Sequence, residues 1–163
     1  MEWTCTSSQG STLSCRDGSI AMALITLRKE PECHTMCFSD TFRQLPIEKE
    51  ASLTDALEKV KYIPFRQTDC SLPMKYAIEN ELMIDTFIVY TDSETYYGNI
   101  HPSEALKMYR KKSGIHNAKL IVVGMSSNGF TIADPNDPNM LDVVGFDTST
   151  PEIISAFSSG EVI

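Results

Sequence analysis

The apolar positions of this chain fall into two patterns, continuous short runs and runs at helical spacing. Continuous runs over 86–91 and 118–125 are typical of parallel strands that are buried on both faces. Alternation between the two patterns predicts a doubly wound, mostly parallel α/β sheet flanked by helices. The expected helices cover 11–28, 52–63, 72–81, 101–114 and 150–160, and shorter strands cover 34–40, 40–47, 130–135 and 142–146.

Residues at the expected helix ends give these boundaries a physical basis. Ser52 is a favourable N-cap, and Pro73 suits the first turn of the helix that it opens. Gly114 suits the position just past a helix C-terminus. The last turn of the helix before Gly114 carries three basic residues, which we interpret as a complement to the helix dipole: Arg110, Lys111 and Lys112.

Composition narrows the class of protein. The 163 residues fit one domain, and no apolar run approaches the length of about 20 residues that crosses a bilayer. A net charge of −8 argues against this segment gripping nucleic acid by itself, because phosphate binding needs clustered Lys and Arg. The five cysteines form no disulfide framework and no secretory signal is visible, so we expect a reducing, cytoplasmic location.

Two polar clusters follow apolar elements and each contains Thr-Asp, at 66–71 and at 90–95. Ligands in open α/β sheets bind past the carboxyl ends of the strands, which is where Asp92 is expected. Hydroxyl and carboxylate oxygens are the ligands that Mg²⁺ prefers. The alternative interpretation is local: Thr68 and Ser71 cap the helix at 72–81, and Asp92 opens a turn.

Several longer motifs, "TDCSLPM", "DTFIVYTDSET" and above all "GMSSNGFTIADP", resemble the C-terminal von Willebrand factor A domain of the Ro autoantigen family, the RNA-binding TROVE ribonucleoproteins. The resemblance covers about 10–163 and leaves 1–9 as a divergent segment. It implies a Rossmann-like sheet with a metal-ion-dependent adhesion site, which binds Mg²⁺ or another divalent cation. Matched position by position, it assigns Thr68 to the second metal loop and Asp92 to the third.

The first metal loop of that family, Asp-x-Ser-x-Ser after a central first strand, has no counterpart in 1–9. The strings at 17–21 and 69–73 follow no buried strand, so we interpret both as coincidence. Ser7 or Ser8 could offer a hydroxyl but no charge, and we expect a weakened metal site. The central position could be filled by 2–6 or by movement of 34–38, or the chain could be a short variant with a weak fold.

The resemblance further implies a non-enzymatic interaction module. The parent ribonucleoproteins bind small noncoding Y RNAs and misfolded RNAs mainly through the helical-repeat ring that precedes this domain, and a partner carboxylate completes the metal's coordination. A second reading is a metal-dependent hydrolase, with Asp92 as ligand and Asp69 or Glu94 as base; it needs a further carboxylate cluster from Asp134 and Asp137. A third is a truncated variant without metal or RNA function.

Other candidate residues carry weaker signals. One interpretation of Cys33, His34 and Cys37 is a zinc site. A structural zinc site needs four ligands, however, and no second pair of ligands follows in the sequence. We therefore expect packing or free thiols there. His101 and His116 flank the helix at 101–114 without a visible acid partner, so we expect ordinary surface histidines.

Overall fold

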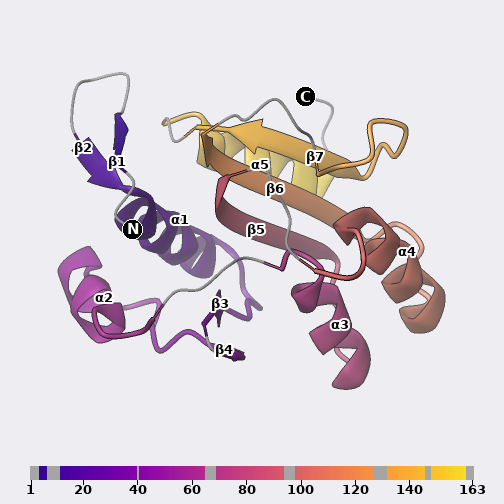
Figure 1. Cartoon of the computed structure of the whole chain (residues 1–163), viewed down its shortest axis with the longest axis horizontal. Helices are drawn as coiled ribbons and strands as arrows, with labels where there is room; N and C mark the ends of the chain where they lie inside the picture. The colour runs from indigo at the N-terminus through magenta and orange to yellow at the C-terminus, as the bar shows by residue number, and fades with distance from the viewer. Residues whose placement is uncertain are drawn as a thin grey trace. The chain divides into compact units, whose positions relative to one another are not determined.

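A computed structural model describes residues 4–6, 12–39, 41–64, 69–93, 98–126, 132–145 and 148–160. The chain divides into two compact units, Met1–Gln67 and Thr68–Ile163, each with its own strands and helices (Figure 1). Within the described ranges, no helix has the length and apolar character needed to span a membrane.

The first unit contains two antiparallel strand pairs and two helices. Strand β1 pairs with β2, and β3 pairs with β4. Short strands were expected at 34–40 and 40–47, and both are confirmed as β3 and β4. The elements are β1 (Thr4–Thr6), β2 (Thr12–Ser14), α1 (Cys15–Lys29), β3 (Met36–Phe38), β4 (Phe42–Gln44) and α2 (Leu53–Val60).

The helix predicted from residue 11 begins later, at Cys15. Ser14 is extended, with φ −68° and ψ 148°, and its Oγ accepts a hydrogen bond from the Asp17 backbone N–H at 3.0 Å. This N-cap ends the strand and starts the helix at the same residue. Leu13 fitted the helical spacing but is paired with Cys5 in the hairpin. Among the described strands, β1 and β3 therefore pair inside the first unit rather than with the strand at 86–91.

Apolar side chains from α1, β3 and α2 pack into one core in this unit. Its members are buried, and they comprise Ile20, Leu24, Cys37, Leu45, Ile47, Ala56, Val60 and Ile63. Two arginines of α1 hold the segment that contains α2. Arg16 donates to the Val60 carbonyl, and Arg28 donates to the carbonyls of Lys49 and Ala51 at 2.9 and 2.6 Å. The predicted Ser52 cap is confirmed, since its Oγ accepts from the Asp55 N–H.

The second unit is built on a three-stranded parallel sheet in the order β5-β6-β7. Phe87 is opposite Leu120, and Leu120 is opposite Met140. The predicted helices are confirmed with boundaries shifted by a few residues. The elements are α3 (Leu72–Glu79), β5 (Thr86–Ser93), α4 (Pro102–Ser113), β6 (Lys119–Ser126), β7 (Met140–Val144) and α5 (Thr150–Ser159).

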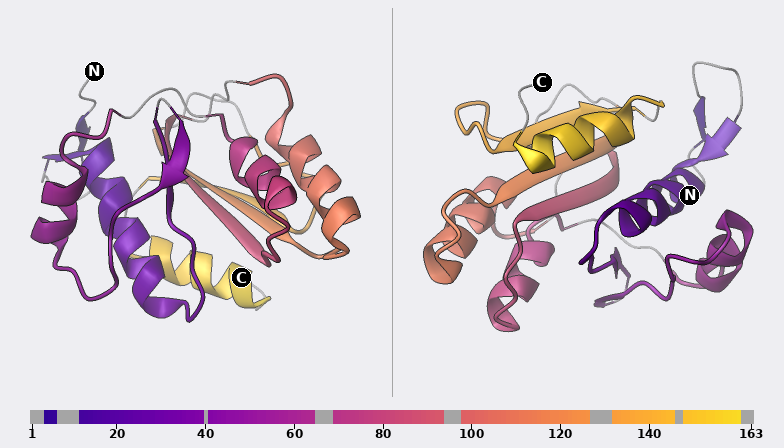
Figure 2. Two further views of the ribbon diagram at one scale, coloured as in Figure 1. Left: turned by 90° about the horizontal axis from the view of Figure 1, so that it is seen from below. Right: turned by 180° about the vertical axis from the view of Figure 1, so that it is seen from behind.

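Strand β6 is central and buried on both faces. Residues 120–123 are at most 1% exposed, as expected of a continuous apolar run in a parallel sheet. Helices α3 and α4 lie on one face of the sheet and α5 lies on the other (Figure 2). This arrangement confirms the Rossmann-like α/β fold expected from the sequence.

Two strand predictions at the end of the sheet need correction. The strand predicted over 130–135 is wrong for its described part, because 132–135 forms bends and turns. The Asp134 carboxylate accepts from the Asn136 N–H at 3.0 Å, an arrangement that favours a turn over a strand. Strand β7 runs from Met140 to Val144 instead of 142–146, and Gly145, at φ 89°, ends it.

Tyr109 of α4 joins this helix to the segment that leads into β5. Its ring packs edge-on against Phe87, with ring centroids 4.9 Å apart. Its hydroxyl accepts from the Ile84 N–H at 2.6 Å and donates to the Leu82 carbonyl at 2.9 Å. The side chain is 1% exposed, so these two backbone groups depend on it for hydrogen bonds.

We predict that Tyr109→Phe lowers the free energy of unfolding by about 1–2 kcal/mol, because it leaves partly buried backbone groups of Leu82 and Ile84 without this partner. Tyr62→Phe is the matched control, since Tyr62 is 86% exposed and its replacement should change stability by less than about 0.5 kcal/mol. Urea unfolding of the three proteins measures both values. Equal stability of Tyr109→Phe and the parent would show that the hydroxyl contributes nothing.

Candidate functional site

The carboxyl ends of the three parallel strands form one edge of the sheet, where ligands bind in folds of this class. Asp92 is the penultimate residue of β5, so the structure places its backbone at this edge. The strand had been expected to stop at residue 91, but it continues to Ser93. Ser93 is paired with Ser126 of β6, which brings the two strand ends side by side. The backbone of Asp92 therefore lies at the carboxyl edge of the sheet, and its role as a metal ligand stays a prediction.

Thr68 lies outside the described residues, as do Ser7, Ser8 and Glu94. Asp69, the residue after Thr68, is the first described residue of the segment that leads into α3. The Asp69 carboxylate accepts two hydrogen bonds from Ser71, from its N–H at 3.0 Å and from its hydroxyl at 2.5 Å. Lys75 of α3 lies 3.7 Å from the same carboxylate, whose side chain is only 16% exposed. Ser71 is the N-cap residue of α3, but its side chain makes no capping hydrogen bond to the helix. Its hydroxyl donates to the Asp69 carboxylate instead.

Gly98, five residues after the end of β5 at Ser93, lies against the Asp69 side chain. A Cβ atom built on Gly98 would lie 2.5 Å from Asp69 Oδ1 and 2.7 Å from Oδ2. Its φ of 149° also lies in the range that favours glycine. The segment before α3 and the segment after β5 are thus in direct contact. Sequence reasoning missed this pairing, because nothing in the spacing of Asp69 and Gly98 signals it.

Asp134 and Asp137, the acidic pair required by the hydrolase reading, belong to the opposite edge. Both precede Met140, the first residue of β7, and are therefore at the amino ends of the strands. Asp137 forms an ion pair with Arg110 at 2.5 Å, and Arg110 also donates to the Ala118 carbonyl just before β6. Asp134 and Asp137 therefore lie at the opposite edge from Asp92, and they do not form the carboxylate cluster around Asp92 that the hydrolase hypothesis requires.

Comparison with known proteins identifies the domain. A family model described as the Ro60 vWA domain matches residues 1–158. The chain belongs to the Ro60 vWA-domain family. It is 45% identical over 152 residues to the RNA-binding protein RO60 of Caenorhabditis elegans, covering 93% of this chain and 24% of that protein. It is 47% identical over 142 residues to the RNA-binding protein RO60 of Deinococcus radiodurans, covering 87% of this chain and 27% of that one.

A solved structure gives the same result for the fold. The crystal structure of the Deinococcus radiodurans RO (RSR) protein superimposes with a TM-score of 0.85 at 43% identity, over 97% of this chain and 32% of that chain. The vWA-domain chain thus spans about a quarter of the length of the curated relatives it matches. Those relatives are named RNA-binding proteins.

The basic residues at the end of α4 in this vWA domain do more than complement the helix dipole. Arg110 was interpreted that way together with Lys111 and Lys112, but its side chain is only 14% exposed and is held by Asp137 and Ala118. The side chains of Lys111 and Lys112 are exposed. Arg110 therefore lies in the last turn of α4, as predicted, and in addition forms an ion pair with Asp137.

The other sequence candidates occupy structural positions. Cys37 is buried in the core of the first unit. Cys33 is partly buried, and this burial, together with the nearby charge of Glu30, raises the pKa of its thiol. Among the described residues, no three His, Cys, Asp or Glu side chains lie close enough to hold a metal. His101 is the N-cap of α4, where its Nδ1 accepts from the Ser103 N–H at 3.2 Å.

We predict that Asp137→Asn destabilises the domain by about 2 kcal/mol at neutral pH, because it removes one partner of a largely buried ion pair. Burial alone would raise the pKa of the Asp137 carboxyl, but hydrogen bonds from Arg110 and Asn139, with the charges of Arg110 and Lys107, lower it overall. A lowered pKa stabilises the fold above the unfolded-state value of about 3.9, and that stabilisation is lost as the pH falls through the folded-state pKa.

The difference in stability between the parent and Asp137→Asn should therefore shrink below about pH 5, as urea unfolding at several pH values will measure. Asp134→Asn is the control, because the side chain of its partner Lys107 is 49% exposed and the pair should contribute little. A difference that stays constant down to pH 3 would contradict the assigned ion pair.

Proposed function

We propose that this chain is the von Willebrand A interaction module of a Ro60-type RNA-binding ribonucleoprotein, with a weak divalent-metal site formed by Thr68 and Asp92. The observation that supports it most directly is the contact between Asp69 and Gly98, which joins the segment next to Thr68 to the segment that follows Asp92. This contact supports the proposal because Asp69 directly follows Thr68 in the sequence and Gly98 lies five residues after the end of β5.

The donor set fits a hard cation. A threonine hydroxyl and an aspartate carboxylate are oxygen ligands, and Mg²⁺ retains several waters when a protein supplies only one or two ligands. When bound, the cation supplies a positive charge with coordination positions open to an acidic side chain of a protein partner. The residues of this chain orient the cation, and the partner's carboxylate completes the contact.

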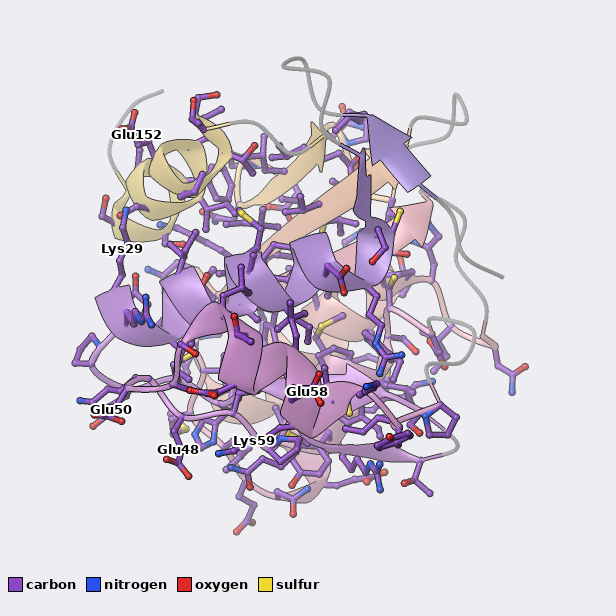
Figure 3. The ribbon with its side chains drawn as sticks, turned by 90° about the vertical axis from the view of Figure 1, so that its left-hand side faces the viewer. Lys29, Glu48, Glu50, Glu58, Lys59 and Glu152 are labelled. Atoms are coloured by element: carbon purple, nitrogen blue, oxygen red, sulfur yellow. The ribbon has the colours of Figure 1, made fainter. Side chains whose placement is uncertain are left out.

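RNA binding is assigned to other parts of the parent ribonucleoprotein, whose RNAs are small noncoding Y RNAs and misfolded RNAs. The charge of −8 supports this division, because an acidic surface repels phosphates. Glu48, Glu50 and Glu58 are exposed on the first unit around α2, and Figure 3 shows their side chains there. Exposed ion pairs balance two of these three carboxylates, because Lys59 lies 3.5 Å from Glu48 and Lys61 lies 3.7 Å from Glu58, so the support for this division comes from the net charge of the whole chain.

We predict that Mg²⁺ stabilises this chain and that Asp92→Ala and Thr68→Ala abolish the effect. At a concentration about 100 times Kd, a ligand that binds only the folded state adds about 2.7 kcal/mol. Thermal unfolding in EDTA and in Mg²⁺ measures the difference. Asp85→Ala is the matched control, because Asp85 is an exposed aspartate just before β5, at its other end. A Mg²⁺ effect that persists in Asp92→Ala would contradict the assignment.

We also predict that the isolated chain gives no mobility shift with a small structured RNA at micromolar concentration and physiological salt. The control is a triple variant, Glu48→Lys, Glu50→Lys and Glu58→Lys, which changes the net charge from −8 to −2 (three changes of +2) and should bind RNA more strongly. Salt-dependent RNA binding by the parent chain would overturn the proposed division between this domain and the rest of the protein.

A further inference from the structure

Helices α3 and α4 both end at the amino edge of the sheet in the second unit. Helix α3 leads into β5 and α4 leads into β6, and the two helices lie on the same face of the sheet (Figure 2). Tyr109 joins their ends, because its hydroxyl bonds to backbone groups of Leu82 and Ile84. The segment 79–85, which follows α3, therefore lies beside the last turns of α4.

Met108 and Lys112 lie on the side of α4 that is turned toward this segment. Successive helix residues are about 100° apart, so these two side chains lie about 40° apart around the helix axis. Arg110 points about 160° away from both and reaches Asp137 and the Ala118 carbonyl, which precede β7 and β6. Because β5 lies on the other side of β6 from β7, the opposite side of α4 faces the end of α3 and the start of β5.

Two methionines are exposed at this end of the unit. Met83 is 68% exposed and lies between the two residues that Tyr109 binds. Met108 is 43% exposed and directly precedes Tyr109 in α4. Methionine side chains are flexible and polarizable, so they adapt to the surfaces that they contact. The two methionines can thus form the apolar centre of a small interface.

Charges of opposite sign lie on the two sides of this centre. Glu81 and Asp85 flank Met83, whereas Lys111 and Lys112 are in the last turn of α4. All four charged side chains are exposed, and none forms an ion pair within the part of the chain that the structure describes. We call this region the methionine surface, and its members are Glu81, Met83, Asp85, Met108, Lys111 and Lys112.

A twofold axis matches such a surface to a second copy of itself. In a twofold contact the same patch of both copies meets, so the acidic side of each copy can lie against the basic side of the other. A partner with charges of one sign would be attracted to one side and repelled by the other. We propose that the methionine surface joins two copies of this chain into a twofold homodimer, with the methionines at the centre and the opposite charges paired around them.

Sedimentation velocity of the full chain, from micromolar to millimolar concentration, tests the proposal. The parent should shift from the mass of a monomer to that of a dimer as its concentration rises. Lys111→Glu with Lys112→Glu makes the surface wholly acidic, and Glu81→Lys with Asp85→Lys makes it wholly basic. Each pair of changes should weaken the homodimer by about 10-fold or more, because charges of like sign then meet.

A mixture of the two charge-reversed variants tests the twofold arrangement itself. Each variant carries the charge sign that the other lacks, so an equimolar mixture should form a heterodimer although neither variant forms a homodimer. Met83→Ser with Met108→Ser tests the apolar centre without changing any charge, and it should weaken the parental dimer by about 10-fold. This variant still decides the question if a charge-reversed variant does not fold, which thermal unfolding of each protein will show.

The matched control is Lys29→Glu with Lys49→Glu, at exposed lysines of the first unit. It changes the net charge from −8 to −12 (two changes of −2), as the lysine variant of α4 does, and it should leave the dimer intact. Loss of the dimer in this control as well would show that total charge, not the methionine surface, decides association.

Three other results would overturn the proposal. A parent chain that remains monomeric at every concentration would leave the methionine surface to a different protein. A dimer that survives both charge reversals, or variants that form no heterodimer when mixed, would place the contact elsewhere. Species that continue to grow beyond the dimer would indicate a head-to-tail contact instead of a twofold one.

Discussion

Burial of β6 on both faces is the constraint on which the second unit depends. Leu120, Ile121, Val122 and Val123 present apolar side chains alternately to the two faces, so each face must be covered. Parallel neighbours require crossover connections, and α4 provides the one between β5 and β6. The position of the helices and the separation of the two sheet edges both follow from this buried strand.

The two edges of the sheet then take different roles. At the amino edge, charged side chains satisfy backbone groups: Arg110 binds Asp137 and the Ala118 carbonyl. Lys119 donates to the Phe157 and Ser158 carbonyls at the end of α5, at 2.8 and 2.9 Å. These groups are fully engaged in the fold. The carboxyl edge instead carries Asp92 and the Asp69 contact, and it is the edge at which a ligand is expected.

The sequence was most informative where one physical signal acted locally. Continuous apolar runs located β5 and β6 and placed Asp92 at the carboxyl end of β5, and Ser52 and Gly114 located helix ends. The predictions were wrong where tertiary pairing decided the outcome. Leu13 fits the helical spacing but is paired with Cys5 in the hairpin of β1 and β2, and no spacing signals the ion pair that Arg110 forms with Asp137 in addition to its place at the helix end.

The Asp69–Gly98 contact lies beyond any single-sequence pattern, because it depends on how two segments return to the same edge. Local spacing assigned Asp69 either to chance or to a catalytic base, whereas its surroundings show a fixed, charge-balanced carboxylate.

The central claim is that the carboxyl edge of this domain binds a divalent cation. The most direct measurement is a Mg²⁺ titration followed by ¹H–¹⁵N correlation spectra of the ¹⁵N-labelled chain. The account predicts saturable shifts confined to the amides of Thr68, Asp69, Asp92, Gly98 and their neighbours, with Asp85, Gly114 and Asp137 at the amino edge unchanged. Shifts centred on Asp134 and Asp137, or no saturable shift at all, would contradict it.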